Sequence, residues 1–199
     1  MRTDIFYKIS EKYNVTVKEA ELKEDIPLLL SKNKNIFYVN KRYSLESQVY
    51  SVFHTLAHRQ LGTLCSESNA EEEKAAEILT YELLIPEDEI RGFINYTLFK
   101  LKDIFPYCSF ETIAKRLLYL RRIVLTIWYS YTLVFREKTT EDFSIKNPDP
   151  FEIECMKYSF KNQSSIGRAN ENRKLKCFSY FIKEESKKKV ILLTERINI

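Results

Sequence analysis

The sequence predicts an α+β fold in which a helix-rich N-terminal domain precedes a small antiparallel β domain. Apolar residues recur every three or four positions in residues 45–62 and 69–84, which indicates amphipathic helices. Beyond residue 150 apolar and polar residues alternate, which indicates strands. Residues 138–150, "KTTEDFSIKNPDP", have the composition of a linker. We therefore expect one domain over residues 1–137, a linker over 138–150 and a small β domain over 151–199.

The first 44 residues predict one helix and three strands. Residues 3–13 place four apolar side chains on one helical stripe. The segment "NVTVKEAEL" alternates as a strand does, and "IPLLLSKNKNIFYVN" reads as a hairpin with its turn at residues 31–35.

Four further helices are expected between residue 44 and the linker. Ser44 is a suitable N-cap for the helix over 45–62, and Gly62 is a suitable end. Pro86 closes the helix over 69–84, a third helix covers 87–103, and Ser109 opens a fourth that continues through "ETIAKRLLYLRRIVL". After the linker, "FEIECMKYSF" and "LKCFSYFIKEESKKKVILLTERINI" read as three strands.

The composition is that of an ordinary globular protein of the cytoplasm. The chain of 199 residues is 44% hydrophobic and 30% charged. Its three glycines form neither a P-loop nor a dinucleotide fingerprint. Four scattered cysteines and an N-terminus without an apolar segment favour reduced thiols in a cytoplasm. The longest uncharged run, Ile123–Phe135, has 13 residues and is too short to span a membrane.

The net charge of +4 is concentrated in the last quarter of the chain, where residues 151–199 hold 11 Lys and Arg against 6 Asp and Glu. The basic segments "RANENRK" and "KEESKKK" fall between expected strands, so a solvated loop face is the simpler interpretation. A surface for nucleic acid or an acidic partner is the alternative.

Both histidines of the chain lie in "YSVFHTLAH", as His54 and His58. On a helix, residues four apart share one face, so both imidazoles can reach one metal ion. This spacing alone is weak, because two ordinary helix histidines would give it as well. The next helix offers a third ligand in Glu71-Glu72-Glu73, and the small Ala75 and Ala76 would let that helix approach closely.

Three segments, "IFYVN", "YSVFHTLAH" and "EKAAEILTYELLIP", together resemble the ImmA/IrrE family of zinc metallo-endopeptidases. That family has a strand ending in Asn, then F-T-L-A-H-E-L-G-H, then E-x-E-A-N-x-F-A-x-x-L-L-M-P. The later "CSFETIAKRLLYL" is similar to its V-S-x-x-A-x-x-R-L helix, so the resemblance covers roughly residues 1–125. It implies a zincin-like fold for the N-terminal domain.

The resemblance implies a zinc site formed by His54, His58 and Glu73. The family's general-base glutamate falls on Thr55, a residue with no basic form near neutral pH. Ala57 for Gly is a milder departure, and Glu77 stands where the family usually has Asn or Asp. A second register is possible, which places Arg59 on the glutamate and Gly62 on the second histidine, but it keeps only one histidine ligand. We prefer the first register because it preserves three ligands.

The resemblance therefore implies a zinc-peptidase relative that has kept its metal ligands and lost its base. Losing a general base typically costs about 10² to 10⁴ in rate. We expect a regulatory or partner-binding protein of bacterial or mobile-element regulation, with a repressor-type DNA-binding protein as its partner. The alternative is an active zinc endopeptidase in which Glu72 or Glu77 serves as the base. A nucleic-acid-binding module that uses the basic C-terminal face is a third possibility.

Overall fold

The computed structural model describes residues 2–64, 69–121, 123–129, 132–138, 147–184 and 187–197. The chain divides into two compact units, each considered by itself below. The first comprises Met1–Ile90 with Lys102–Ser109, and the second comprises Arg91–Leu101 with Phe110–Ile199. No described helix is both long and apolar enough to cross a membrane.

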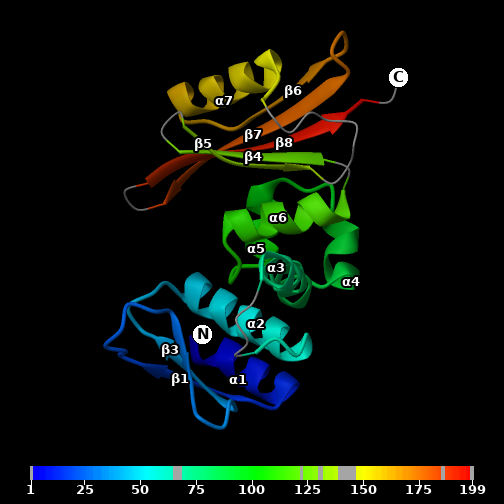
Figure 1. Ribbon diagram of the computed structural model, residues 1–199. Coiled ribbons are helices and arrows are strands. Elements are labelled where there is room, and N and C mark those ends of the chain that lie inside the picture. The colour runs from blue at the N-terminus through cyan, green and yellow to red at the C-terminus, as the bar shows by residue number, and fades with distance from the viewer. Residues whose placement is uncertain are drawn as a thin grey trace. The chain divides into compact units, whose positions relative to one another are not determined.

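In the described residues, one helix and a small group of strands are followed by a run of helices, and then by further strands with one helix among them (Figure 1). The helices are α1 (Arg2–Tyr13), α2 (Leu45–Gln60), α3 (Ala70–Leu84), α4 (Glu87–Ile90), the 3-10 helix η1 (Arg91–Phe93), α5 (Leu98–Ile104), α6 (Phe110–Leu120) and α7 (Pro150–Asn162). The strands are β1 (Thr16–Ala20), β2 (Leu28–Leu30), β3 (Ile36–Asn40), β4 (Ile123–Tyr129), β5 (Thr132–Lys138), β6 (Ile166–Asn170), β7 (Leu175–Glu184) and β8 (Lys187–Arg196).

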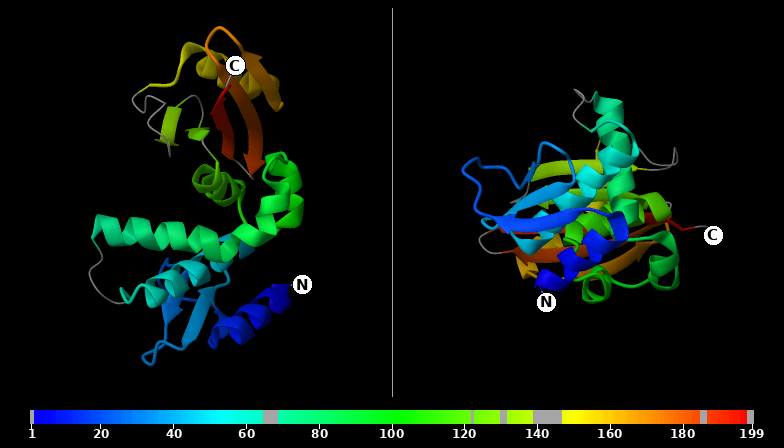
Figure 2. Two further views of the ribbon diagram at one scale, coloured as in Figure 1. Left: turned by 90° about the vertical axis from the view of Figure 1, so that its right-hand side faces the viewer. Right: turned by 90° about the horizontal axis from the view of Figure 1, so that it is seen from below.

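The first unit is built on a three-stranded sheet of order β1-β3-β2, in which β1 is parallel and β2 antiparallel to β3. Helices α1 and α2 supply apolar side chains to one core with this sheet, and α3 runs alongside α2 (Figure 2). The expected helix, strand and hairpin of this region are therefore confirmed. The buried core residues are Phe6, Ile9, Val15, Phe37, Val39, Val49, Val52, Phe53 and Leu56.

Two buried amides fix α2 to the end of the central strand. The Asn40 side chain donates to the carbonyl of Ile26 at 3.0 Å, which ties β3 to the segment before β2. The Gln48 side chain donates to the carbonyls of Asn40 and Tyr43, each at 2.9 Å. Both amide side chains are fully buried, so this polar junction sets where α2 begins relative to the sheet.

The second unit is a five-stranded antiparallel sheet of order β5-β4-β8-β7-β6 with helices on both faces (Figure 1). Helix α7 packs on the face that carries Trp128, Cys177 and Val190. Helix α6 covers the other face, where Glu111 forms an ion pair with Lys189 at 2.8 Å. The α+β class and the C-terminal antiparallel sheet expected from the sequence are confirmed.

The expected strand "FEIECMKYSF" is wrong, because residues 150–162 form α7. Its start carries two helix signals. Pro150 occupies the first turn, and Asp149 and Glu152 form a capping box in which each side chain accepts from the other's backbone N–H. These local signals, together with burial of Cys155 and Met156 against the sheet, outweigh the apparent alternation.

The C-terminal sheet begins before the expected linker. Strand β4 overlaps the end of the expected fourth helix, which continued through Leu125, and lies within the expected first domain, but it pairs with β8 along its whole length. The run Ile123–Tyr129 is rich in β-branched and aromatic residues and is buried, which suits a central strand. The compact units therefore do not coincide with the expected boundaries. Residues 139–146 of the expected linker lie outside the described residues.

The expected helix over 87–103 is interrupted. It consists of α4, η1 and α5, separated at residues 94–97. A turn closes at Tyr96, whose N–H donates to the carbonyl of Phe93 at 2.8 Å. The Thr97 hydroxyl then accepts from the N–H of Lys100, as an N-cap does, so α5 starts anew.

Candidate metal centre

The two histidines lie on one face of α2 because they are four residues apart on a regular helix. Ser44 caps this helix through its side chain, which accepts from the N–H of Ser47. The ring centroids of His54 and His58 are 4.7 Å apart and the rings are nearly perpendicular. Both side chains are mostly buried, with 24% and 14% of their surface exposed.

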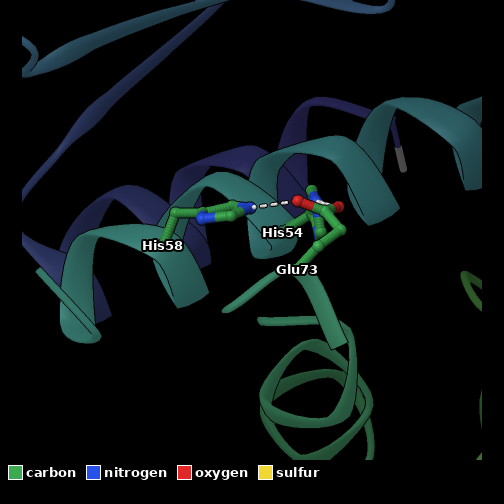
Figure 3. A group of neighbouring side chains, drawn as sticks. All are labelled: His54, His58 and Glu73. Carbon is green, nitrogen blue, oxygen red and sulfur yellow. Dashed lines mark hydrogen bonds and ion pairs between the residues drawn. The ribbon is translucent and has the colours of Figure 1, made fainter. Parts of the chain in front are cut away.

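Glu73 from the first turn of α3 lies opposite both rings. Its two carboxylate oxygens are 2.9 Å from His54 Nε2 and 3.3 Å from His58 Nε2. Figure 3 shows both rings turned toward this one carboxylate. One ligand atom from each of the three residues lies within 4.8 Å of the other two. The structure therefore brings together the three residues that the sequence analysis named.

Helix α3 is held in place at its start by a capping box. The Asn69 side chain accepts from the N–H groups of Glu71 and Glu72, and the Glu72 carboxylate accepts from the N–H of Asn69. Ala76 is fully buried, whereas Ala75 is exposed. Of the two small residues expected to allow close approach to α2, only Ala76 is in a position to do so.

Thr55 is tied to its own helix. Its hydroxyl donates to the carbonyl of Ser51 at 2.8 Å. This is the usual i−4 bond of a threonine inside a helix. The side chain at the position that the resemblance assigns to a general base is thus directed toward the helix backbone.

The residues of the second register do not form a comparable group. Arg59 is exposed on the far end of α2. Gly62 has a φ of +73° in the turn that follows the helix and offers no side-chain ligand. The geometry matches the register with His54 and His58.

The cluster is part of a longer polar seam between α2 and α3 that sequence reasoning missed. Tyr50 stacks on His54 with ring centroids 5.8 Å apart and planes 12° apart. Tyr50 also shares a hydrogen bond with Tyr81, whose hydroxyl donates to Glu77. The spacing was a usable signal: Tyr50, His54 and His58 are four apart on one helix, and so are Glu73, Glu77 and Tyr81 on the next.

Burial dominates the protonation equilibria of the seam. It lowers the pKa of His54, although the carboxylate of Glu73 acts in the opposite direction. It raises the pKa of Tyr50 to about 12, and the charge of Glu77 adds to this effect. The histidine is thus held in the neutral form that metal ions require of an imidazole ligand.

The ligand atoms of His54, His58 and Glu73 can be compared with those of known zinc sites. Two imidazole nitrogens and one carboxylate are the three protein ligands found in one class of catalytic zinc site, with a fourth position left for water or substrate. The Glu73 side chain is 52% exposed, so the cluster is accessible from solvent on that side. The residues present fit a zinc ion.

Comparisons with known proteins bear on the family and the fold of the chain. The family model described as the IrrE N-terminal-like domain, a peptidase family, matches residues 10–118. A solved structure described as a Mycobacterium tuberculosis transcriptional regulator is similar to the chain with a TM-score of 0.73 and 13% sequence identity. The similarity covers 98% of this chain and 69% of the regulator. No curated protein matches the sequence.

Proposed function

The chain belongs to the family of the IrrE N-terminal-like domain, and on that premise we propose that it is a zinc-binding, catalytically impaired relative of the family's peptidases. The observation that carries the proposal is the convergence of His54, His58 and Glu73 on one point beside a residue, Thr55, that cannot act as a base. Its role would be regulatory, through binding of a partner protein.

His54 Nε2, His58 Nε2 and one oxygen of Glu73 would hold the zinc ion. Zinc bound there would polarise a peptide carbonyl and lower the pKa of water, as it does in zinc hydrolases generally. The chain's own residues must then accept a proton and pass it to the leaving amine, because peptide hydrolysis requires both transfers.

Each candidate for that proton transfer already has another hydrogen-bond partner among the described residues. The Thr55 hydroxyl has no basic form near neutral pH, and its proton is donated to the Ser51 carbonyl. Of the two carboxylates that the alternative names as the base, Glu72 accepts from the N–H of Asn69 in the capping box. Glu77 accepts from the hydroxyl of Tyr81 on the Tyr50 side of His54. These contacts favour impaired catalysis over the alternative of an active endopeptidase.

We propose a repressor-type DNA-binding protein as the partner. It draws on the regulatory role that the resemblance to the ImmA/IrrE family implies and on the fold shared with a transcriptional regulator. Direct binding of nucleic acid by the basic C-terminal segment is less favoured. Arg168, Arg173 and Lys189 of that segment form ion pairs with carboxylates of their own unit.

The proposed setting is a reducing cytoplasm. Cys108, Cys155 and Cys177 are free thiols in the described part of the chain. All three are buried, as structural cysteines of intracellular proteins commonly are.

The test restores the missing base. In zinc-loaded protein assayed on a quenched fluorescent peptide library, Thr55→Glu should raise the cleavage rate by up to the general-base factor of about 10² to 10⁴. Thr55→Gln is the matched control, since it has the same shape and no basic carboxylate. Adding His58→Ala to Thr55→Glu should abolish the gain. Zinc-dependent cleavage by the unaltered protein at the rate of the Thr55→Glu variant would refute the proposed impairment.

A further inference from the structure

A threonine hydroxyl stands behind each histidine ring, on the side away from Glu73. His54 Nδ1 is 3.2 Å from the hydroxyl oxygen of Thr80. His58 Nδ1 is 2.8 Å from the hydroxyl oxygen of Thr63. The two threonines come from different segments, α3 and the turn after α2, so each ring has its own partner.

The single proton of the Thr80 hydroxyl is already committed. That hydroxyl donates to the carbonyl of Ala76 at 2.6 Å, and the side chain is fully buried. A hydroxyl has one proton to give, so toward His54 its oxygen can only accept. The proton between them therefore belongs to His54 Nδ1. In a neutral imidazole this leaves the lone pair on Nε2, the atom 2.9 Å from Glu73.

Thr63 lies against the same ring atom of His58. Its hydroxyl oxygen is 2.8 Å from His58 Nδ1 and 3.4 Å from the carbonyl oxygen of His58. The chain can fold back in this manner because Gly62 takes a φ of +73°, a left-handed conformation that glycine adopts without strain. The Thr63 N–H also donates to the His58 carbonyl, at 2.9 Å, which closes the turn.

The Nε2 lone pair of His54 then points at an oxygen of Glu73, which is an acceptor as well. Two acceptors 2.9 Å apart repel each other unless a cation lies between them. For His58, binding of the same cation by Nε2 requires the ring proton on Nδ1, where the Thr63 hydroxyl oxygen can accept it. We infer that Thr80 and Thr63 are positioning residues that fix both histidines as Nε2 ligands for a divalent metal ion. The inference rests on the proposed zinc site. It predicts that neither threonine touches the metal and that each acts through one ring.

The first measurement is zinc affinity by competition with a chromophoric chelator. Groups that orient metal-bound histidines typically contribute about 10–100-fold to metal affinity, so Thr80→Val and Thr63→Val should each raise the zinc Kd by about that factor. Thr80→Ser keeps a hydroxyl and should retain the original affinity. Ser51→Ala is the matched control, because the Ser51 hydroxyl bonds only to the backbone of α2 in the described contacts.

The second measurement separates positioning from general destabilisation. The chain has only two histidines, so ¹⁵N-histidine labelling gives one pair of ring nitrogens for each. In the zinc-loaded protein Thr80→Val should abolish the protected Nδ1–H resonance of His54 and leave that of His58. Thr63→Val should do the reverse.

The outcomes distinguish this inference from the proposed function. An unaltered protein that binds no zinc overturns both. An unaltered protein that binds zinc, with unchanged affinity and unchanged ring resonances in both valine variants, overturns the threonine inference alone. Loss of the resonance on the ring facing the altered threonine, with weakened zinc binding, supports it.

Discussion

At the scale of the residue, the chemistry of this protein depends on which groups have protons to give. Thr55 and Thr80 direct their hydroxyl protons to backbone carbonyls, so toward a neighbouring group each can only accept. For Thr80 this suits the N–H of a histidine ring. For Thr55 it leaves a position without the basic group that peptide hydrolysis requires.

The carboxylate of Glu111, in the second unit, leads to a prediction about how the stability of the protein depends on pH. Burial opposes the charged form of Glu111, but hydrogen bonds from Lys189 and Tyr129 and the charge of the lysine together lower its pKa. A carboxylate whose pKa is lower in the folded state than in the unfolded state stabilises the folded state at pH values above its unfolded-state pKa. This stabilisation is lost as the pH falls through the folded-state pKa.

Glu111→Gln should therefore lower the free energy of unfolding at pH 7, and its deficit should shrink as the pH falls below about 4. Urea unfolding at several pH values measures the difference between the two proteins. Glu154→Gln is a suitable control, because that carboxylate is 65% exposed in its ion pair with Arg168. A deficit for Glu111→Gln that stays constant down to pH 3 would contradict the assigned cause.

At the scale of the element, the metal centre depends on two antiparallel helices that approach closely. His58 and His54 face Glu73, and Tyr50 faces Tyr81, so the seam continues along the pair. Ala76 lies one turn before Thr80 on α3 and is fully buried.

Ala76→Leu should force the helices apart and disrupt the seam. Overpacking a well-packed site typically costs about 1–3 kcal/mol of stability. Because Glu73 and Thr80 lie on the displaced helix, zinc affinity should fall as well. Ala75→Leu makes the same change on the exposed side and should leave zinc affinity and the urea midpoint near their original values. Equal behaviour of the two variants would show that helix approach does not limit the site.

The elements also show what sequence can and cannot predict. The positions of His54, His58 and Glu73 follow from helical spacing and motif resemblance, which are properties of local sequence. Thr80 and Thr63 could not be assigned from sequence, because their bonds to the rings depend on tertiary approach and on the turn at Gly62. Helix α7 was predictable in principle, since Asp149, Pro150 and Glu152 form a start signal that the alternation obscured.

At the scale of the whole molecule, the boundaries of the compact units do not coincide with the linker that the composition predicts. The linker-like stretch begins at the end of β5, and the central strands β4 and β8 of one sheet lie before and after this stretch in the sequence. The pairing of β4 with β8 joins residues far apart in sequence, and no local pattern reports such a pairing.

A fragment ending at residue 137 should therefore fold poorly. It would remove β6, β7 and β8 and expose the apolar side chains of β4, including the fully buried Ile123 and Leu125. An exposed apolar strand with unpaired backbone groups favours aggregation. Size-exclusion chromatography should show the full chain as a defined species and the fragment as aggregate. A well-behaved fragment would support the domain boundary expected from the sequence.

The most direct test of the central claim is the zinc content of the purified full chain after metal loading and removal of free metal. We expect about one zinc ion per chain, since one three-residue cluster is described. His54→Ala, His58→Ala and Glu73→Ala should each lose it, whereas Glu71→Ala, which removes an exposed neighbouring carboxylate, should keep it. A chain that holds no zinc, or one whose zinc survives all three ligand substitutions, would contradict the account.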